Sequence, residues 1–219
     1  MATLQVTEAM RVPDGITPAL TRRRVGLCLL AALPVAACQT PPPNVLPALT
    51  FDSARPLPLD VANLVIEDLS AYSPQTAEDS AGEPADNELN EPIAAVVGRW
   101  ARQRFFAIGQ SGTARLVIEQ ATLRRELLAR SQGLRGIVTV DQSERFSTRL
   151  AVRMVLNDPA TARDGFAWAS VSGSTTIAEN ATLAKRQSEL FTMVEQAINQ
   201  LDQTLVAEMR QKVSSFVKR

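Results

Sequence analysis

The chain has 219 residues, with 23 basic and 23 acidic side chains, two cysteines and no histidine. Balanced charge argues against a nucleic-acid partner bound through net charge. The lack of histidine excludes Ser-His-Asp and Cys-His catalysis and His-ligated zinc, so we expect a protein that is not an enzyme and needs no metal or cofactor.

The N-terminal segment has the layout of a secretory signal peptide. Arg22, Arg23 and Arg24 precede an uncharged stretch, residues 25–37, that ends in the run Val35-Ala36-Ala37-Cys38. A basic region, a short apolar region and small residues before a cleavage point are the features of such signals. Thirteen apolar residues are too few to cross a bilayer, which takes about 20.

The cysteine that ends this segment resembles the lipobox of bacterial lipoproteins. That resemblance implies that residues 1–37 are removed as a lipoprotein signal peptide and that Cys38 is the lipid attachment residue. The lipid, palmitate among its acyl chains, would anchor the protein in a membrane of the cell envelope, facing the periplasm. Gln39 follows the cysteine instead of Asp, which in the sorting pattern of this class favours the outer membrane. The alternatives are an ordinary signal with an accidental cysteine, or a short buried helix, and Met10 is an alternative start.

The mature chain would contain one domain behind a spacer. Removing 37 residues leaves 182, without a free thiol and with a net charge near −2, which suits one ordinary domain. Residues 38–60 contain six prolines and are predicted to form an extended tether. The alternative for its second half is docking on the domain through four apolar residues, Val45, Leu46, Leu49 and Phe51.

Residues 61–219 are predicted to form a single α+β domain that begins with a strand and an acidic loop. Val61 to Leu69 is short and rich in β-branched residues, as strands are. Residues 73–90 carry five acids with glycine and prolines, which indicates a flexible loop. A cation site there is the alternative, but the spacing of an EF-hand is absent.

A helix is predicted next, from Asn90 as the capping residue to Gly109. Its arginines are expected to form an exposed charged face: Arg99, Arg102 and Arg104. The glycines of residues 109–112 follow a helix and lack a Gly-Lys-Ser/Thr sequence, so this segment is predicted to be a turn and not a phosphate-binding loop.

The rest of the domain is predicted to contain strands and then one long helix. Alternating apolar residues indicate strands over 113–128, 145–156 and 165–177, and a helical period covers 180–216, about 55 Å at 1.5 Å per residue. The expected fold is α+β, with an antiparallel sheet of about four strands, two helices on one face and a long C-terminal helix. The long helix would either project towards a partner or bend to cover the sheet.

This order of elements behind a lipobox resembles the auxiliary lipoproteins of envelope transport systems. The resemblance implies a membrane-anchored, non-catalytic accessory or assembly module with a protein partner in the envelope. It suggests a role in a transport system and assigns no oligomeric state. The connection 129–144, with Arg130 and Arg135, is the expected contact surface, and a solvated hairpin connection is the alternative.

Two other classes of function stay open. A carboxylate-dependent hydrolase would use one of the acid pairs near ordered elements, Glu67 with Asp68 or Asp141 with Glu144. Adjacent strand residues point to opposite faces, which argues against the first pair. A structural protein that binds the cell wall noncovalently is the third class.

Overall fold

The computed structural model describes residues 49, 55–72, 82–128 and 142–218, all within the compact unit Pro43–Arg219. Several predicted features lie outside these residues: the signal peptide, Cys38, Val45, Leu46, Phe51, Arg130, Arg135 and Asp141. The same holds for residues 73–81, the first half of the predicted acidic loop.

The main sheet contains five strands and mixes parallel with antiparallel pairing. Its order is β2 (Asn63–Asp68), β5 (Thr113–Leu127), β6 (Gln142–Asp158) and β7 (Arg163–Ala178), and the short β3 (Glu83–Pro84) pairs with β5. β5, β6 and β7 are antiparallel, as predicted, but β2 runs parallel to β5. The expectation of a purely antiparallel sheet is therefore wrong, because a crossover that contains a helix connects β2 to β5 and such a connection permits parallel pairing.

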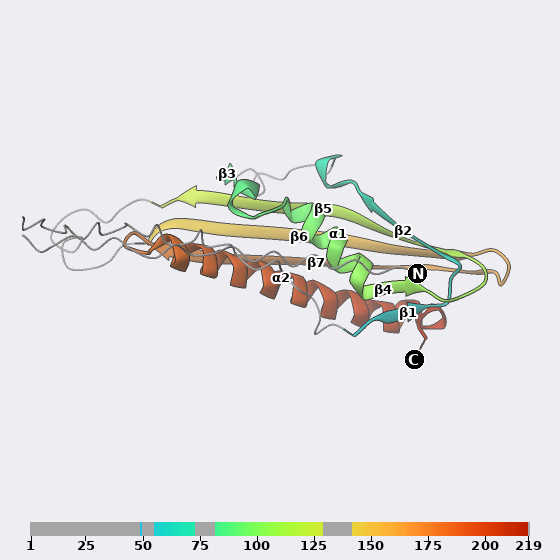
Figure 1. Cartoon of the computed structure of the whole chain (residues 1–219). Coiled ribbons are helices and arrows are strands. Elements are labelled where there is room, and N and C mark those ends of the chain that lie inside the picture. Colours follow the sequence, from blue (N-terminus) through green and yellow to red (C-terminus); the bar gives the residue numbers. More distant parts are fainter. Residues whose placement is uncertain (1–48, 50–54, 73–81, 129–141, 219) are drawn as a thin grey trace, which may run out of the picture. The chain divides into compact units, whose positions relative to one another are not determined.

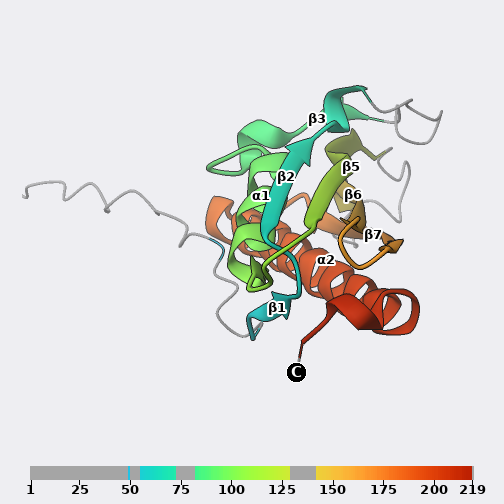
Figure 2. The same cartoon turned by 90° about the vertical axis from the view of Figure 1, so that its right-hand side faces the viewer.

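Two helices cover one face of this sheet (Figures 1 and 2). Helix α1 (Ile93–Arg104) packs on β5 and β2, and α2 (Leu183–Lys212) packs on β7 and β6. Three short 3-10 helices, η1 (Ser70–Tyr72), η2 (Asp86–Glu88) and η3 (Ser214–Phe216), complete the helical elements of the described residues.

Helix α1 is shorter than predicted at both ends. Pro92 and not Asn90 is the N-cap residue, and it makes no side-chain cap. The first helical amide, that of Ile93, instead donates to the Asp86 Oδ1 at 3.1 Å. The helix ends at Arg104 because the next three residues form β4 (Phe105–Ala107), which pairs in parallel with β1 (Leu57–Leu59). Leu57, Leu59 and Leu49 are buried in the core, so part of the segment assigned to the tether packs on the domain.

The alternating pattern of β6 is confirmed. Its residues facing the helices are all buried: Phe146, Thr148, Leu150, Val152, Met154 and Leu156. The neighbouring β7 instead presents small residues to α2, namely Ala167, Ala169 and Gly173. A Cβ added at Gly173 would lie 3.6 Å from the Met193 Cγ, so small side chains allow this close packing of helix on sheet.

The C-terminal segment turns back instead of extending one long helix. Thr182 caps α2 by accepting a hydrogen bond from the Lys185 amide at 3.3 Å, and the helix has 30 residues, not the predicted 37. After Val213, η3 brings Phe216 into the core and Val217 bridges to Leu59. The described end of the chain therefore covers the domain itself.

Gly112 in the turn before β5 and Gly98 in α1 give a matched test of the local backbone conformation. Gly112 has φ +79°, and an added Cβ would lie 2.9 Å from the Asn157 carbonyl oxygen, whereas a Cβ on Gly98 in α1 meets nothing closer than 3.5 Å. We expect Gly112→Ala to lower the free energy of unfolding by more than about 1 kcal/mol. Gly98→Ala should raise it by up to about 1 kcal/mol, since alanine favours a helix.

Urea unfolding followed by circular dichroism measures both values. Equal effects of the two substitutions would contradict the conformation assigned to residues 109–113.

Candidate functional site

The candidate site is the sheet face that α1 and α2 leave uncovered, which we call the open face. It is formed by alternate residues of β5, β6 and β7. On β7 every second residue from Asp164 to Thr176 is exposed, while the residues between them are buried or half-buried. The predicted one-sided sheet is therefore present, and its wet side is available for binding.

A hollow of about 250 Å³ lies in the middle of the open face. Two cross-strand rows form it, one of Thr122, Arg149 and Ser172 and the other of Arg124, Ser147 and Ser174. We call it the hydroxyl hollow. Its groups are guanidinium donors, which suit carboxylate or carbonyl oxygens, and hydroxyls that both donate and accept. Arg124 also donates to the Gly82 carbonyl oxygen at 3.1 Å, so part of its orientation is fixed by the chain beside β3.

An aromatic cluster lies on the same face, nearer the β6–β7 hairpin. Phe166 and Trp168 are two residues apart on β7 and expose 51% and 44% of their surfaces. The Glu119 carboxylate accepts two hydrogen bonds. Its Oε2 accepts from the Trp168 Nε1 at 2.9 Å, and its Oε1 accepts from the Arg153 Nε at 2.6 Å. The Arg153 guanidinium lies 5.6 Å from the centroid of the Phe166 ring. We call these four residues the aromatic platform.

A buried carboxylate fixes the hairpin next to the platform. The Asp158 side chain is fully buried and accepts hydrogen bonds from Thr161 Oγ1 at 2.5 Å, Arg163 Nη2 at 2.9 Å and Ser111 Oγ at 3.1 Å. These bonds hold the pKa of Asp158 at about 2, with the Thr161 bond as the largest cause. The segment predicted to be a turn, residues 109–112, thus contributes Ser111 to this cluster.

Arg163 connects this hairpin to the two ends of the domain. It donates to Asp60 Oδ2 at 3.2 Å and to the Ser215 carbonyl oxygen at 2.8 Å, and its guanidinium lies 4.6 Å from the Phe216 ring centroid. The hydrogen bond to Asp158 is the main reason that the pKa of Arg163 is raised. The position of the hairpin therefore depends on one arginine.

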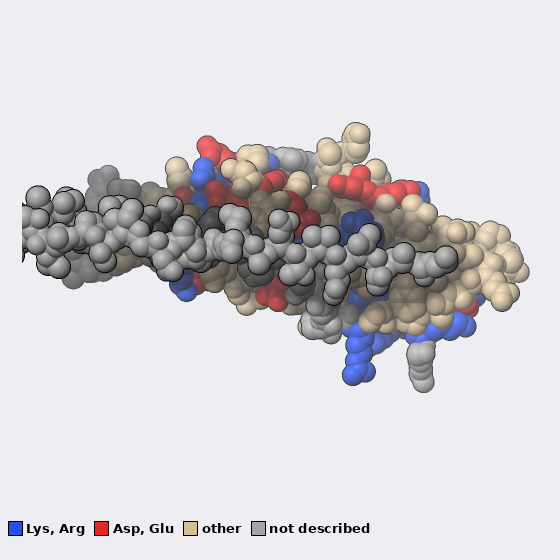
Figure 3. Space-filling view, viewed as in Figure 1, with Lys and Arg blue, Asp and Glu red and all other residues tan. Residues whose placement is uncertain are grey.

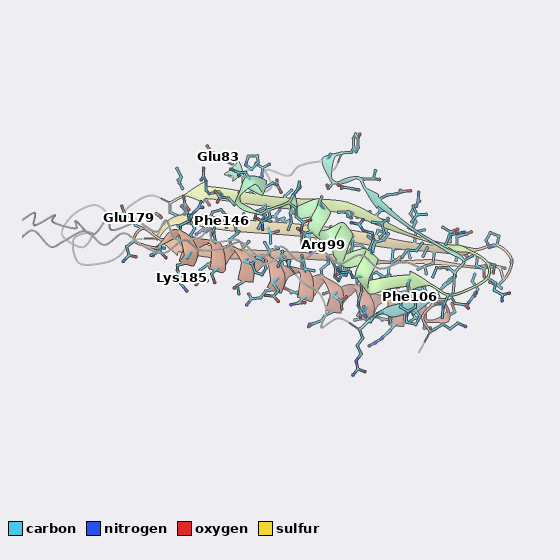
Figure 4. The ribbon with its side chains drawn as sticks, viewed as in Figure 1. Glu83, Arg99, Phe106, Phe146, Glu179 and Lys185 are labelled. Carbon is cyan, nitrogen blue, oxygen red and sulfur yellow. The ribbon has the colours of Figure 1, made fainter. Side chains whose placement is uncertain are left out.

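A second ion-pair cluster fixes the opposite end of the sheet. Arg186 of α2 binds Glu88 of η2 at 2.5 Å and Glu144 of β6 at 2.8 Å. Its guanidinium lies 5.0 Å from the ring centroid of Phe146, which is labelled in Figure 4. The hydrogen bond from Arg186 lowers the pKa of Glu88 and raises that of the arginine. Glu144, one member of a predicted acid pair, is thus ion-paired with Arg186.

The other predicted acid pair is divided between two local contacts. Glu67 lies 3.7 Å from Arg115 across the sheet. Asp68 accepts hydrogen bonds from the amide and hydroxyl of Ser70, at 3.0 and 2.6 Å, and so starts η1.

The arginines of α1 do not form a uniformly exposed face. Arg104 is buried, and its Nε lies 2.6 Å from Asp202 of α2, which also accepts from the Trp100 Nε1 at 3.2 Å. Arg99 donates to the Leu49 carbonyl oxygen at 2.6 Å and pairs with Glu91. The expectation of an exposed charged face is wrong for Arg104, because α2 supplies a carboxylate at the helix interface.

Basic side chains gather near the C-terminal end of α2, on the side shown in Figure 3. A hollow of about 460 Å³ lies there, lined by Leu57, Arg210, Ser214, Val217 and Lys218. Lys218 pairs with Asp60 at 3.2 Å, and this contact is the largest cause of the lowered pKa of Asp60.

Among the described residues, no helix is both long and apolar enough to cross a membrane. Within the same ranges, no three acidic, cysteine or histidine side chains group as a metal site would require.

Comparison with known proteins gives solved structures but no family. No protein-family model and no curated protein matches the chain. Rare lipoprotein B from Shewanella oneidensis is 15% identical, with a TM-score of 0.33, over 66% of this chain and 94% of that one. A minor lipoprotein from Acinetobacter baumannii is 13% identical, with a TM-score of 0.33, over 72% and 96%.

A protein of the DUF330 family from Xanthomonas campestris is 10% identical, with a TM-score of 0.33, over 70% of this chain and 88% of that one. Two of these three similar structures are thus bacterial lipoproteins by name. At such low TM-scores the likeness assigns neither a fold family nor a function to this chain.

Asp158 predicts a specific response of stability to acid. Because its folded pKa is about 2 and its ordinary value is 3.8, its contribution is complete above pH 3.8 and is lost as the pH falls towards 2. We expect Asp158→Asn to lower stability at pH 7 and to flatten the decline between pH 4 and 2. Urea unfolding at a series of pH values measures this, and an unchanged slope in the variant would contradict the role of Asp158.

Proposed function

We propose that this chain is a lipid-anchored lipoprotein of the bacterial cell envelope and acts as a non-catalytic accessory or assembly module. It is held by Cys38 in a membrane, with the outer membrane favoured by Gln39, and faces the periplasm. Its open face binds an envelope protein partner. The observation that carries the proposal is the hydroxyl hollow on a sheet face that both helices leave uncovered.

The chemistry of the hollow supports binding over catalysis. Two arginines and several hydroxyls line it. Guanidinium groups donate hydrogen bonds and stay protonated, and unactivated serine and threonine hydroxyls are weak nucleophiles and poor general bases. Such a lining is suited to holding carboxylate and main-chain carbonyl oxygens of a partner.

The construction of the face supports a preformed binding surface. Its three long strands are antiparallel and continuous over 15 to 17 residues each, and ion-pair clusters fix both ends. Binding residues held by regular strands need little ordering when a partner arrives, which lowers the entropic cost of association. A tether would let this surface reach a partner away from the membrane.

The anchor is tested at Cys38. Mass spectrometry of the mature protein should find Cys38 as the first residue with a diacylglycerol on its thiol. Cys38→Ala should remove the modification and move the protein from the membrane fraction to the soluble periplasmic fraction, because the domain behind it has no other proposed anchor. Cleavage at another residue, or an unmodified thiol in the wild type, would contradict this part of the proposal.

The binding face is tested by photo-crosslinking in cells. A photoreactive residue placed at Ser172, in the hollow, should give a discrete crosslink to an envelope protein, and the additional change Arg149→Glu should abolish it by reversing a charge in the binding surface. The same residue placed at Gln196, exposed on α2, is the matched control and should give no such product. A partner captured only at Gln196 would move the interface to the helical side.

A further inference from the structure

The aromatic platform is held in place by contacts from three strands. β5 carries a bulge between Ile118 and Gln120, so Glu119 is an extra residue opposite β6. Bulges often redirect a side chain. Here the redirected carboxylate binds Trp168 and Arg153, and Arg153 in turn contacts Phe166. Three strands thus cooperate to hold two aromatic rings at the surface.

The hydrogen bond to Glu119 determines how the indole lies. Trp168 is on β7 and Glu119 is on β5, with β6 between them. Those strands are two spacings of about 4.8 Å apart, so the Trp168 ring must extend across β6 for its Nε1 to reach the carboxylate at 2.9 Å. The indole is therefore held across the sheet while 44% of the Trp168 surface stays exposed.

A shallow hollow of about 240 Å³ continues from the platform towards the hairpin. Its lining includes Phe166, Arg153, Asn157 and Asp164. An amide, a guanidinium and a carboxylate thus line the same hollow as one aromatic ring. These groups supply both hydrogen-bond donors and acceptors.

We propose that the platform and this hollow bind a neutral saccharide chain. The C–H face of a pyranose ring is apolar and flat, so it stacks on an exposed aromatic ring, while its hydroxyl groups each donate and accept hydrogen bonds. Phe166 and Trp168, two residues apart on one strand, are placed for consecutive stacking contacts along a chain. Asn157, Asp164 and Arg153 bind the hydroxyls of the ring over Phe166.

Charge and area select this ligand over others. Arg153 is ion-paired with Glu119, and Asp164 adds a carboxylate, so the hollow has no excess positive charge to attract a phosphate. Two half-exposed aromatic residues present roughly 200 Å² of apolar surface, well below the ~800 Å² per partner of a stable protein interface. A neutral ligand the size of a sugar ring is compatible with both the balanced charge and the small apolar area.

This inference does not depend on the proposed protein partner or on the lipid anchor. The hydroxyl hollow uses Thr122, Arg149 and Ser172, whereas the saccharide site uses residues nearer the hairpin. The experiment below measures a small ligand on the purified full chain, so it can fail while the crosslink at Ser172 succeeds, and the reverse.

The test is a fluorescence titration with cellotetraose, chitotetraose and maltotetraose. The chain has two tryptophans, of which Trp100 is 1% exposed and Trp168 is 44% exposed, so a ligand stacked on the platform changes the Trp168 emission. We expect a saturable change with at least one of these oligosaccharides below about 10 mM, a range that includes weak binding with a Kd of 1 mM. Phe166→Ala should weaken binding about tenfold, as expected from the loss of an aromatic contact.

Two further variants separate binding from folding. Glu119→Gln should shift the emission of the free protein and weaken binding, because it loosens the indole while leaving both rings present. Tyr72→Ala, which removes an aromatic residue that is 83% exposed on η1, should leave the titration unchanged. Circular dichroism should give the same fold for all variants.

The proposal is overturned if none of the three oligosaccharides changes the emission, or if Tyr72→Ala weakens binding as much as Phe166→Ala. It is also overturned if vesicles of anionic phospholipid produce the Phe166-dependent change and the saccharides do not.

Discussion

The packing of α2 on the small residues of β7 is the contact on which the rest of the structure depends. Ala167, Ala169 and Gly173 let the helix approach the sheet closely, and the helix in turn buries Leu190, Val194, Leu201 and Leu205. Apolar burial contributes about 25 cal/mol per Å², so this layer supplies much of the stability of a domain whose described residues contain no cysteine. The helix also decides which surface is open to binding, because it covers one face and leaves the other face of the same strands in water.

Two polar clusters keep that arrangement in register. At one end, Arg163 connects the β6–β7 hairpin to Asp60 and to the turn after α2; at the other, Arg186 connects the first turns of α2 to η2 and to β6. Each places a guanidinium between two carboxylates and against an aromatic ring. Partly buried ion pairs of this kind are weak evidence for net stability. Their geometric effect is clear, since each joins segments that are distant in sequence and so limits sliding of the helix along the sheet.

Local patterns predicted the long elements well and the short ones poorly. The alternation of β6 and the helical period of α2 each extend over a dozen residues or more, so tertiary contacts could not override them. The three-residue strands β1 and β4 have no such signal, because their pairing joins Leu57 to Phe105. The parallel pairing of β2 could not be read from β2 itself. The contact that satisfies the first amide of α1 could not be predicted either, since Asp86 lies seven residues before Ile93, outside the usual capping positions.

The candidate site shows most directly why sequence alone was insufficient. Side chains alternate along a strand. If β5 were regular, all its odd-numbered residues, before and after Glu119, would therefore face the same side of the sheet. In that case Arg115 and Val117 would face water while Thr122 and Arg124 faced the helices. After the bulge at Glu119, the even-numbered residues face the open side instead. This places Thr122 and Arg124 on the open face beside Ser147 and Arg149. The same extra residue holds Trp168. One inserted residue thus determines the lining of the hydroxyl hollow and the position of the Glu119 carboxylate in the aromatic platform. In the sequence it appears only as a change of phase after Ile118, which an alternation assumed to be regular does not take into account. Any relative of this chain without that insertion should lack both surfaces together.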